Sequence, residues 1–143
     1  MPYRYLEEIA TADVAFEAWG TSREELFTAA ADALMQVMVD DLATVRSRQE
    51  VVVRLEHEAI DLLLFAFLQE LIFHKDARRL LLRVAAIAIE QAGATLALHA
   101  TFRGEEIDPS RHTLVVDVKA VTLHRFQVEH RDDTWRAQVV LDI

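Results

Sequence analysis

Apolar and polar residues recur at helical spacing in two long segments of the chain. In the first, apolar residues return every three to four positions from Leu26 to Met38, with polar residues on the opposite side. Ser22 and Glu25 precede this stripe at capping-box spacing, in which the hydroxyl accepts from a first-turn N–H and the carboxylate reaches back. The pattern predicts an amphipathic helix over 23–39, ended by two aspartates.

The second helical segment is the more apolar of the two. The residues of its stripe are Ile60, Leu63, Leu64, Phe67, Leu68, Leu71 and Ile72. Further apolar residues at Leu62, Phe65 and Phe73 widen the stripe beyond one face. We therefore expect this helix to be mostly buried.

Alternation with a period of two marks most of the remaining chain as β-strand. It predicts strands over 14–19, 51–56, 80–89, 95–102, 117–130 and 134–143, with a turn at Ala92-Gly93 and a loop over 104–110. Strands clustered after the helices indicate an α+β fold, with largely antiparallel β-sheet packed with two main helices. With 143 residues, 52% of them hydrophobic, and no linker-like stretch, we expect a single domain over 1–143.

The charge balance limits the classes of partner. The formal net charge is −9, and the arginines are dispersed along the chain. Affinity for nucleic acid comes largely from cations that displace counterions, so we expect little or no direct binding of RNA or DNA. An acidic surface is better suited to basic protein partners or metal ions.

Composition also bears on the compartment. The N-terminal residues lack the features of a secretion signal, and the apolar stretches are too short to span a bilayer. The sequence contains no cysteine, which fits a reducing environment. We therefore expect a cytoplasmic protein without membrane association.

Two acidic residues stand at the outer ends of the first and last predicted strands. Asp13 precedes the strand that leads to Trp19, and Asp142 is followed only by Ile143. First and last strands often neighbour each other, so Asp13, Asp142 and the main-chain carboxylate of Ile143 would form an all-oxygen cluster. Such a cluster suits a hard divalent cation such as Ca²⁺ or Mg²⁺. The alternative is that Asp13 forms a local turn with its own backbone.

A second group of polar residues lies in the block Lys-Ala-Val-Thr-Leu-His at 119–124. On a regular strand, Thr122 and His124 project from one face and Lys119 from the other. Together they could hold a phosphate or a carboxylate network. The alternative is a half-buried strand with a satisfied histidine and a lysine whose stem covers apolar surface.

The sequence lacks the common motifs of catalysis. It has no Gly-rich phosphate loop, no two-histidine zinc motif and no Gly-x-Ser-x-Gly nucleophile elbow. The residues therefore do not indicate an active site of the chain's own.

Taken in order, four blocks resemble the archease family. They are Thr-Ala-Asp-Val at 11–14, Trp-Gly at 19–20 followed by Glu-Glu-Leu-Phe at 24–27, Lys-Ala-Val-Thr-Leu-His at 119–124, and the final Leu-Asp-Ile. The resemblance extends from Tyr3 to Ile143. The chain departs from the family pattern at Ala10, where His is common, and at Leu123, where Tyr is frequent.

The resemblance implies an accessory protein and not an enzyme. Archeases activate the RtcB-type, GTP-dependent RNA ligase of tRNA splicing and RNA repair, promoting its guanylylation and turnover and broadening its nucleotide use. By this resemblance, Asp13, Asp142 and Ile143 would bind a divalent metal. Calcium is the expected ion, with magnesium and manganese as alternatives.

The resemblance also implies that Lys119, Thr122 and His124 contact the ligase or its nucleotide. Two other classes stay open. One is a metal-dependent hydrolase built on the two aspartates, with His124 as the candidate base. The other is a generic chaperone-like module that binds proteins through exposed apolar surface.

Overall fold

The computed structural model describes residues 2–6 and 13–143. The helices are α1 (Arg23–Met38) and α2 (Ile60–Arg78), with a short 3-10 helix η1 (Leu42–Thr44) between them. The strands are β1 (Tyr3–Leu6), β2 (Asp13–Gly20), β3 (Gln49–His57), β4 (Leu80–Ala92), β5 (Thr95–Glu106), β6 (Ala120–Arg131) and β7 (Thr134–Asp142).

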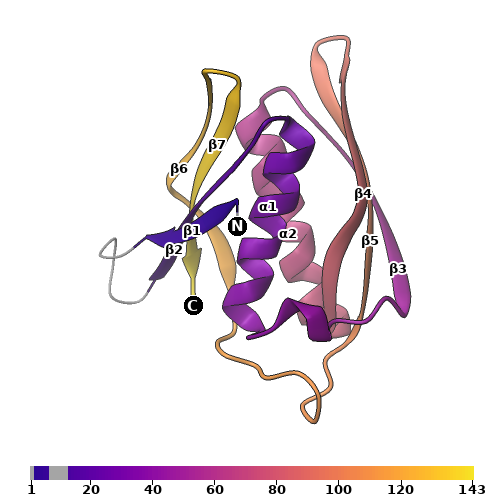
Figure 1. Cartoon of the computed structure of the whole chain (residues 1–143). Helices are drawn as coiled ribbons and strands as arrows, with labels where there is room; N and C mark the ends of the chain where they lie inside the picture. The colour runs from indigo at the N-terminus through magenta and orange to yellow at the C-terminus, as the bar shows by residue number, and fades with distance from the viewer. Residues whose placement is uncertain (1, 7–12) are drawn as a thin grey trace.

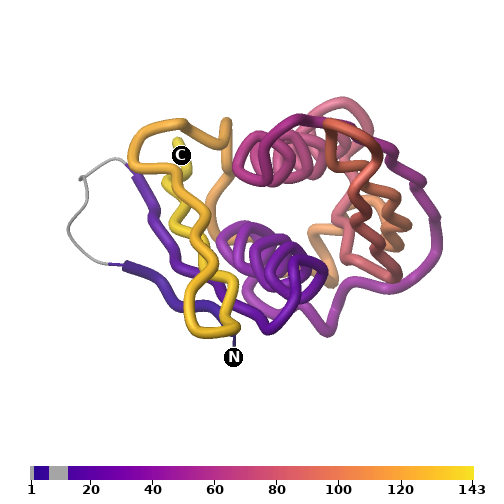
Figure 2. Tube along the Cα trace, turned by 90° about the horizontal axis from the view of Figure 1, so that it is seen from above, coloured from indigo at the N-terminus to yellow at the C-terminus, as the bar shows by residue number. Residues whose placement is uncertain are grey.

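The two helices lie side by side between two antiparallel sheets, as Figures 1 and 2 show from perpendicular directions. One sheet has the strand order β1-β2-β7-β6, and the other has the order β3-β5-β4. The predicted α+β fold, with largely antiparallel sheets packed with two main helices, is confirmed. None of the helices in residues 2–6 and 13–143 is long and apolar enough to cross a membrane.

Helix α1 begins as its sequence predicts. The Ser22 hydroxyl accepts a hydrogen bond from the N–H of Glu25 at 3.1 Å, which satisfies one of the free donors of the first turn. The Glu25 carboxylate, however, accepts from the hydroxyl of Thr21. The helix ends at Met38, within one residue of the prediction.

Two polar residues of α1 contact neighbouring strands. Gln36 accepts a hydrogen bond from the Tyr3 hydroxyl at 2.6 Å, and Asp32 pairs with Arg83 of β4 at 3.2 Å. These contacts tie the same helix to both sheets.

The centre of the core is aromatic. Phe67 of α2 lies between Phe27 of α1 and Phe102 of β5, with ring centroids 5.3 and 5.2 Å away. All three side chains are fully buried. Since aromatic rings supply large buried areas, this stack joins both helices to the smaller sheet.

Two predicted boundaries are wrong. Residues 104–106 belong to β5 and not to a loop, because Gly104 pairs in register with Leu82 of β4. The first strand of the final hairpin, β6, begins at Ala120 and not at Asp117, and its register against β7 shifts between Thr122 and Gln127. The segment 107–119 between these strands crosses from one sheet to the other.

Gly104 provides a test of this packing. A Cβ placed on it would lie 1.7 Å from the main-chain oxygen of Leu81, a contact that no side-chain rotation can relieve. We expect Gly104→Ala to lower the free energy of unfolding by about 3 kcal/mol, the upper end of the usual cost of overpacking. Chemical denaturation measures this loss.

Gly93 supplies the control, because it has φ +64° and open space around its Cβ position. Gly93→Asn should cost only a few tenths of a kcal/mol, since Asn tolerates the left-handed region. Equal denaturation midpoints for Gly104→Ala and the unmodified chain would contradict the close approach of β4 and β5.

Candidate functional site

The two aspartates at the ends of the sequence lie directly opposite each other. Strands β2 and β7 pair in the middle of the larger sheet, and Asp13 is the cross-strand partner of Asp142. Directly opposed residues project to the same side of a sheet, with Cβ atoms about 4.5–5.5 Å apart. The predicted adjacency of the two carboxylates is confirmed, while their role as metal ligands stays a prediction.

The aspartate pair faces away from the helices. The next residues along the two strands, Val14 and Leu141, pair with each other and pack into the core. Because side chains alternate across a strand, Asp13 and Asp142 project from the outer face. Ala120 of β6 continues the row beside Asp142, and its small side chain leaves the space next to the carboxylates open.

Ile143 follows Asp142 directly, and its half-buried side chain packs against the core. This contact restrains the main chain next to Asp142. Thr11 and Ala12 of the first family block, and Ala10, where the chain departs from the family, lie outside the described residues.

Lys119 and Thr122 flank the aspartate pair on the β6 side. The N–H of Lys119 donates to the main-chain oxygen of Asp142 at 2.8 Å, and the lysine side chain is exposed. Thr122 pairs with Val140, two residues before Asp142 on the same face, and its hydroxyl donates to the Val140 oxygen at 3.1 Å. Both residues therefore lie next to the acidic pair.

The regular strand expected through His124 is interrupted. Residues 123–126 lie in the irregular stretch where the β6–β7 register shifts, and Arg125 has φ +53°. Thr122 and His124 consequently do not alternate as they would on an ideal strand. His124 is exposed, and Leu123 is 65% exposed.

The arrangement can supply only part of a metal site from side chains. No group of three or more His, Cys, Asp or Glu that could hold a metal ion occurs in the described part of the chain. Asp13 and Asp142 provide two carboxylates, and the third predicted donor, Ile143, acts through its main chain. Calcium and magnesium accept carboxylate, main-chain and water oxygens together, so this donor set fits a hard cation better than zinc.

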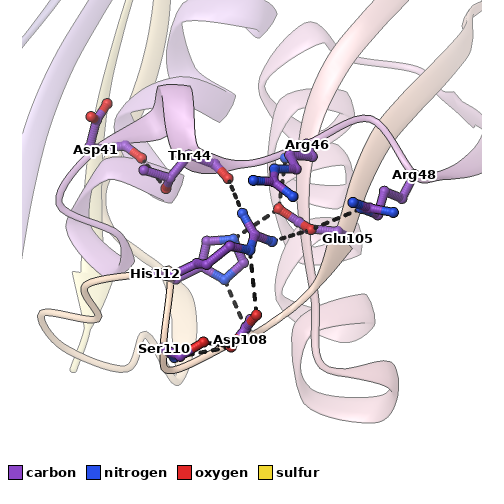
Figure 3. Close-up of polar contacts among 9 residues, drawn as sticks. Asp41, Thr44, Arg46, Arg48, Glu105, Asp108, Ser110 and His112 are labelled. Carbon is purple, nitrogen blue, oxygen red and sulfur yellow. Dashed lines mark hydrogen bonds and ion pairs between the residues drawn. The ribbon is translucent and has the colours of Figure 1, made fainter.

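A second polar cluster, drawn in Figure 3, lies where β5 leaves its sheet. At its centre is Glu105, which is 4% exposed. Its carboxylate accepts from the N–H of Arg46 at 2.8 Å and pairs with the guanidinium of Arg111. It also accepts from Nε2 of the buried His112 at 3.0 Å.

These contacts keep Glu105 ionised. The hydrogen bond from Arg111 outweighs the opposing effect of burial and, with the donors at Arg46 and His112, lowers the pKa of Glu105 to about 2. The Nδ1 atom of His112 accepts from the N–H of Asp108 at 2.8 Å, which leaves the proton on the Nε2 atom that faces Glu105. The cluster thus fixes the start of the crossing segment 107–119.

A third cluster fixes the end of that segment. Lys75 of α2 is only 6% exposed, and its ammonium donates to the Val118 oxygen at 2.8 Å and pairs with Asp117 and Asp76. Burial alone would lower the pKa of Lys75, but the hydrogen bonds that its ammonium donates to Asp117 and Asp76 prevail and raise the pKa. This ion pair holds the chain just before Lys119 and the aspartates.

The sequence pattern did not reveal these two buried clusters. Lys75 follows the apolar stripe of α2 and looks like a solvated helix end, and Glu105 lies in what resembles a breaker loop. The only local signal is that Lys75 comes four residues after Leu71 and so stays on the buried side of the helix.

The fold and the site together define a three-layer α+β domain with an acidic pair on the outer face of its larger sheet. The family model described as the Archease protein family (MTH1598/TM1083) matches residues 3–143. The chain is 34% identical over 134 residues to Protein archease of Pyrococcus furiosus, which covers 93% of this chain and 94% of that one. It is 33% identical to Protein archease of Methanopyrus kandleri over 143 residues, all of both chains.

Solved structures agree with the sequence comparisons. The solution structure of Methanobacterium thermoautotrophicum protein 1598 has a TM-score of 0.86 at 32% identity and covers 99% of each chain. The crystal structure of an archease, described as a possible chaperone, from Thermotoga maritima has a TM-score of 0.65 at 23% identity and covers 94% of this chain and 93% of that one. The chain belongs to the archease family.

The Glu105 cluster yields a prediction for pH dependence. Glu105→Gln should lower the free energy of unfolding at pH 7 by about 3 kcal/mol, because it removes one partner of a buried ion pair. A depressed carboxyl pKa contributes stability above its ordinary value of 4.5, and this contribution is lost as the pH falls towards 2. The difference between the variant and the unmodified chain should therefore shrink between pH 4.5 and pH 2.

Urea denaturation across that range measures the difference, with Glu106→Gln as the matched control because Glu106 is the exposed neighbour. A Glu105→Gln cost that is the same at pH 2.5 as at pH 7 would show that the lost packing matters and the charge does not.

Proposed function

We propose that this chain activates a GTP-dependent RNA ligase of the RtcB type, which acts in tRNA splicing and RNA repair. In this proposal it promotes guanylylation and turnover of the ligase and broadens the range of nucleotides that the ligase uses. The chain acts as a protein cofactor and not as an enzyme. Membership of the archease family and the alignment of Asp13 with Asp142 support the proposal.

The proposed cation site consists of Asp13, Asp142 and the main-chain carboxylate of Ile143. A calcium ion, or magnesium or manganese in its place, would neutralise carboxylates that repel each other at this distance and would fix their orientation. The observation that carries this assignment is the cross-strand register, which brings acidic residues from opposite ends of the sequence onto one face.

The proposed contacts to the ligase or its nucleotide surround that site. The exposed Lys119 ammonium is suited to a phosphate or a carboxylate, and it lies beside Asp142 through the main-chain bond between them. Thr122 and the exposed His124 extend the contact surface along β6.

The physical basis of activation would be a shift in the ligase's conformational equilibrium. To become guanylylated, the ligase must hold its nucleotide, metals and catalytic groups in one geometry, and misplacement of these groups is costly. This chain, with a net charge of −9, would be steered towards a basic active-site cleft. It shifts the equilibrium only if it binds the reactive arrangement more tightly than the idle one.

The first test separates the cation site from the fold. Asp13→Asn and Asp142→Asn should each weaken calcium binding roughly tenfold or more, since each removes one of few charged ligands. Both should abolish the stimulation of guanylate transfer to a purified ligase. Calorimetric titration with calcium and the guanylylation rate are the two measurements.

Asp132→Asn is the matched control, because Asp132 is exposed in the β6–β7 turn and its φ of +54° also suits Asn. A variant with one glycine added after Ile143 moves the main-chain carboxylate and should behave like the aspartate variants. Full stimulation by Asp13→Asn or Asp142→Asn would reject the proposed mechanism.

The second test concerns Lys119. Lys119→Ala should leave calcium binding unchanged but raise the amount of chain needed for half-maximal stimulation by about tenfold, which corresponds to one lost charged hydrogen bond. Arg131→Ala, at the far end of β6, should have no effect. If Lys119→Ala also abolished calcium binding, the lysine would be part of the cation site and not a partner contact.

One observation favours a second function, that of a chaperone-like protein-binding module. Leu114, Val115 and Val116 follow one another in the crossing segment and are 47%, 56% and 38% exposed. Adjacent exposed apolar residues often mark protein-binding surfaces. The guanylylation assay distinguishes the classes: suppression of client aggregation without stimulation indicates the module, and turnover by the chain alone indicates a hydrolase.

A further inference from the structure

A cleft of about 510 Å³ lies on the solvent side of α1, between the two sheets. Trp19 at the end of β2 forms one wall, Ile87 of β4 forms another, and Thr28 and Ala29 of α1 lie between them. In Figure 1, α1 is on the near side of the molecule with β2 to its left and β4 to its right. A volume of this size is typical of ligand-binding clefts.

The charges in this cleft have one sign. The described residues that line it include Glu24, Glu25 and Asp32 but no lysine or arginine. Each carboxylate has a partner outside the cleft or at its edge, such as Arg83 for Asp32, yet a carboxylate can accept more bonds than these partners use. The rest of the lining is largely apolar, so the cleft selects for a group that is both cationic and apolar.

Trp19 marks the β2 end of the cleft, but its ring lies on the far side of the sheet from α1. Asp13 and Trp19 are six residues apart on one regular strand, so both project from the outer face. There the Arg136 guanidinium lies 5.7 Å from the centre of the Trp19 ring. A cationic side chain in the cleft would therefore meet the carboxylates of α1 and not the indole.

The β4 side of the cleft is an open sheet edge. β4 is the outer strand of the smaller sheet, and the N–H of Ile89 points outward, where it donates to the Glu24 carboxylate at 3.0 Å. By the alternation of an antiparallel strand, the N–H and C=O of Ile87 point to the same side. Residues 84–89 carry no charge, and Ala85, Ala86 and Ala88 are small and exposed. The N–H of Ile89 is already bonded to Glu24, whereas at Ile87 no charged or bulky neighbour on β4 obstructs pairing with another strand.

We infer that this cleft binds an extended, basic segment of a partner protein, which pairs with β4 at Ile87 and places a Lys or Arg side chain against the carboxylates of α1. Main-chain hydrogen bonds to the edge would supply affinity, and the acidic, apolar cleft would supply specificity. A free polyamine satisfies the carboxylates but leaves the main-chain groups of the edge without partners, so the peptide is the better match. The site lies at the opposite end of β2 from Asp13 and does not depend on the function proposed above.

The test is selection from a displayed library of random heptapeptides against the full chain. We expect enrichment of peptides with alternating β-branched residues and at least one Lys or Arg. A synthetic peptide from the enriched pool should shift the amide resonances of Ile87 and Thr28, which both line the cleft. An N-methyl group on the peptide's edge-pairing amides should weaken its binding at least tenfold.

Thr28→Lys places a cation inside the cleft without disturbing α1, since Lys is the better helix former. It should weaken binding of the selected peptide at least tenfold. Ser47→Lys makes the same change of charge in an exposed loop outside the cleft and should leave binding unchanged. Circular dichroism and thermal unfolding confirm that both variants are folded.

Absence of enrichment, enrichment of acidic peptides, or equal binding to the Thr28→Lys variant would overturn the inference. Binding of spermine that shifts the amide resonance of Thr28 while no peptide binds would overturn it in favour of a small organic cation. Because the readout is peptide binding, its failure is separate from a failure of ligase stimulation by the unmodified chain.

Discussion

The anchoring of the crossing segment 107–119 is the constraint on which the candidate site depends. This segment carries the chain from the smaller sheet to the larger one, and it is fixed at its start by Glu105 and at its end by Lys75. The register of β6 follows from that end, because the N–H of Lys119 bonds the main chain of Asp142. Two ionic clusters, each centred on one buried charged side chain, thus determine how the polar residues of β6 meet the acidic pair. Buried charges are costly unless every partner is present, so they specify one arrangement more strongly than apolar contacts would.

The helix pair imposes the complementary constraint. Neither sheet could cover α1 alone, since the helix packs on β2 through one side and on β4 through another, and it contacts α2 as well. Its buried alanines, among them Ala29, Ala30 and Ala33, allow this close approach on several sides. The larger sheet therefore has one face covered by helices, and Asp13 and Asp142 project from its other face.

Much of the fold follows from the sequence because its signals are local. Hydrophobic period, a capping serine and alternating strands are properties of a few neighbouring residues, and both helices were predicted within a few residues of their observed bounds. The adjacency of Asp13 and Asp142 was also predictable, since strands near the two ends of a chain often pair, although β1 precedes β2 in the structure. The shift of register after Thr122 was not, because alternation along one strand cannot report how many residues its partner uses. The buried charges were missed because their partners are distant in the sequence. Lys75 meets Asp117 across 42 positions, and Arg46 meets Glu105 across 59.

The geometry of β2 separates the two surfaces that this protein offers. The strand has eight residues, with Asp13 at its start and Trp19 and Gly20 at its end, so the acidic pair and the cleft lie about 20 Å apart at the usual rise per residue. The part of a folded partner that covers the acidic pair would not reach into the cleft as well. An extended tail of about seven residues spans the distance between the two surfaces. Both surfaces are acidic, so one partner could combine a basic active-site cleft with a basic tail. Engagement of both sites would then raise affinity by effective concentration, without any new contact at either one.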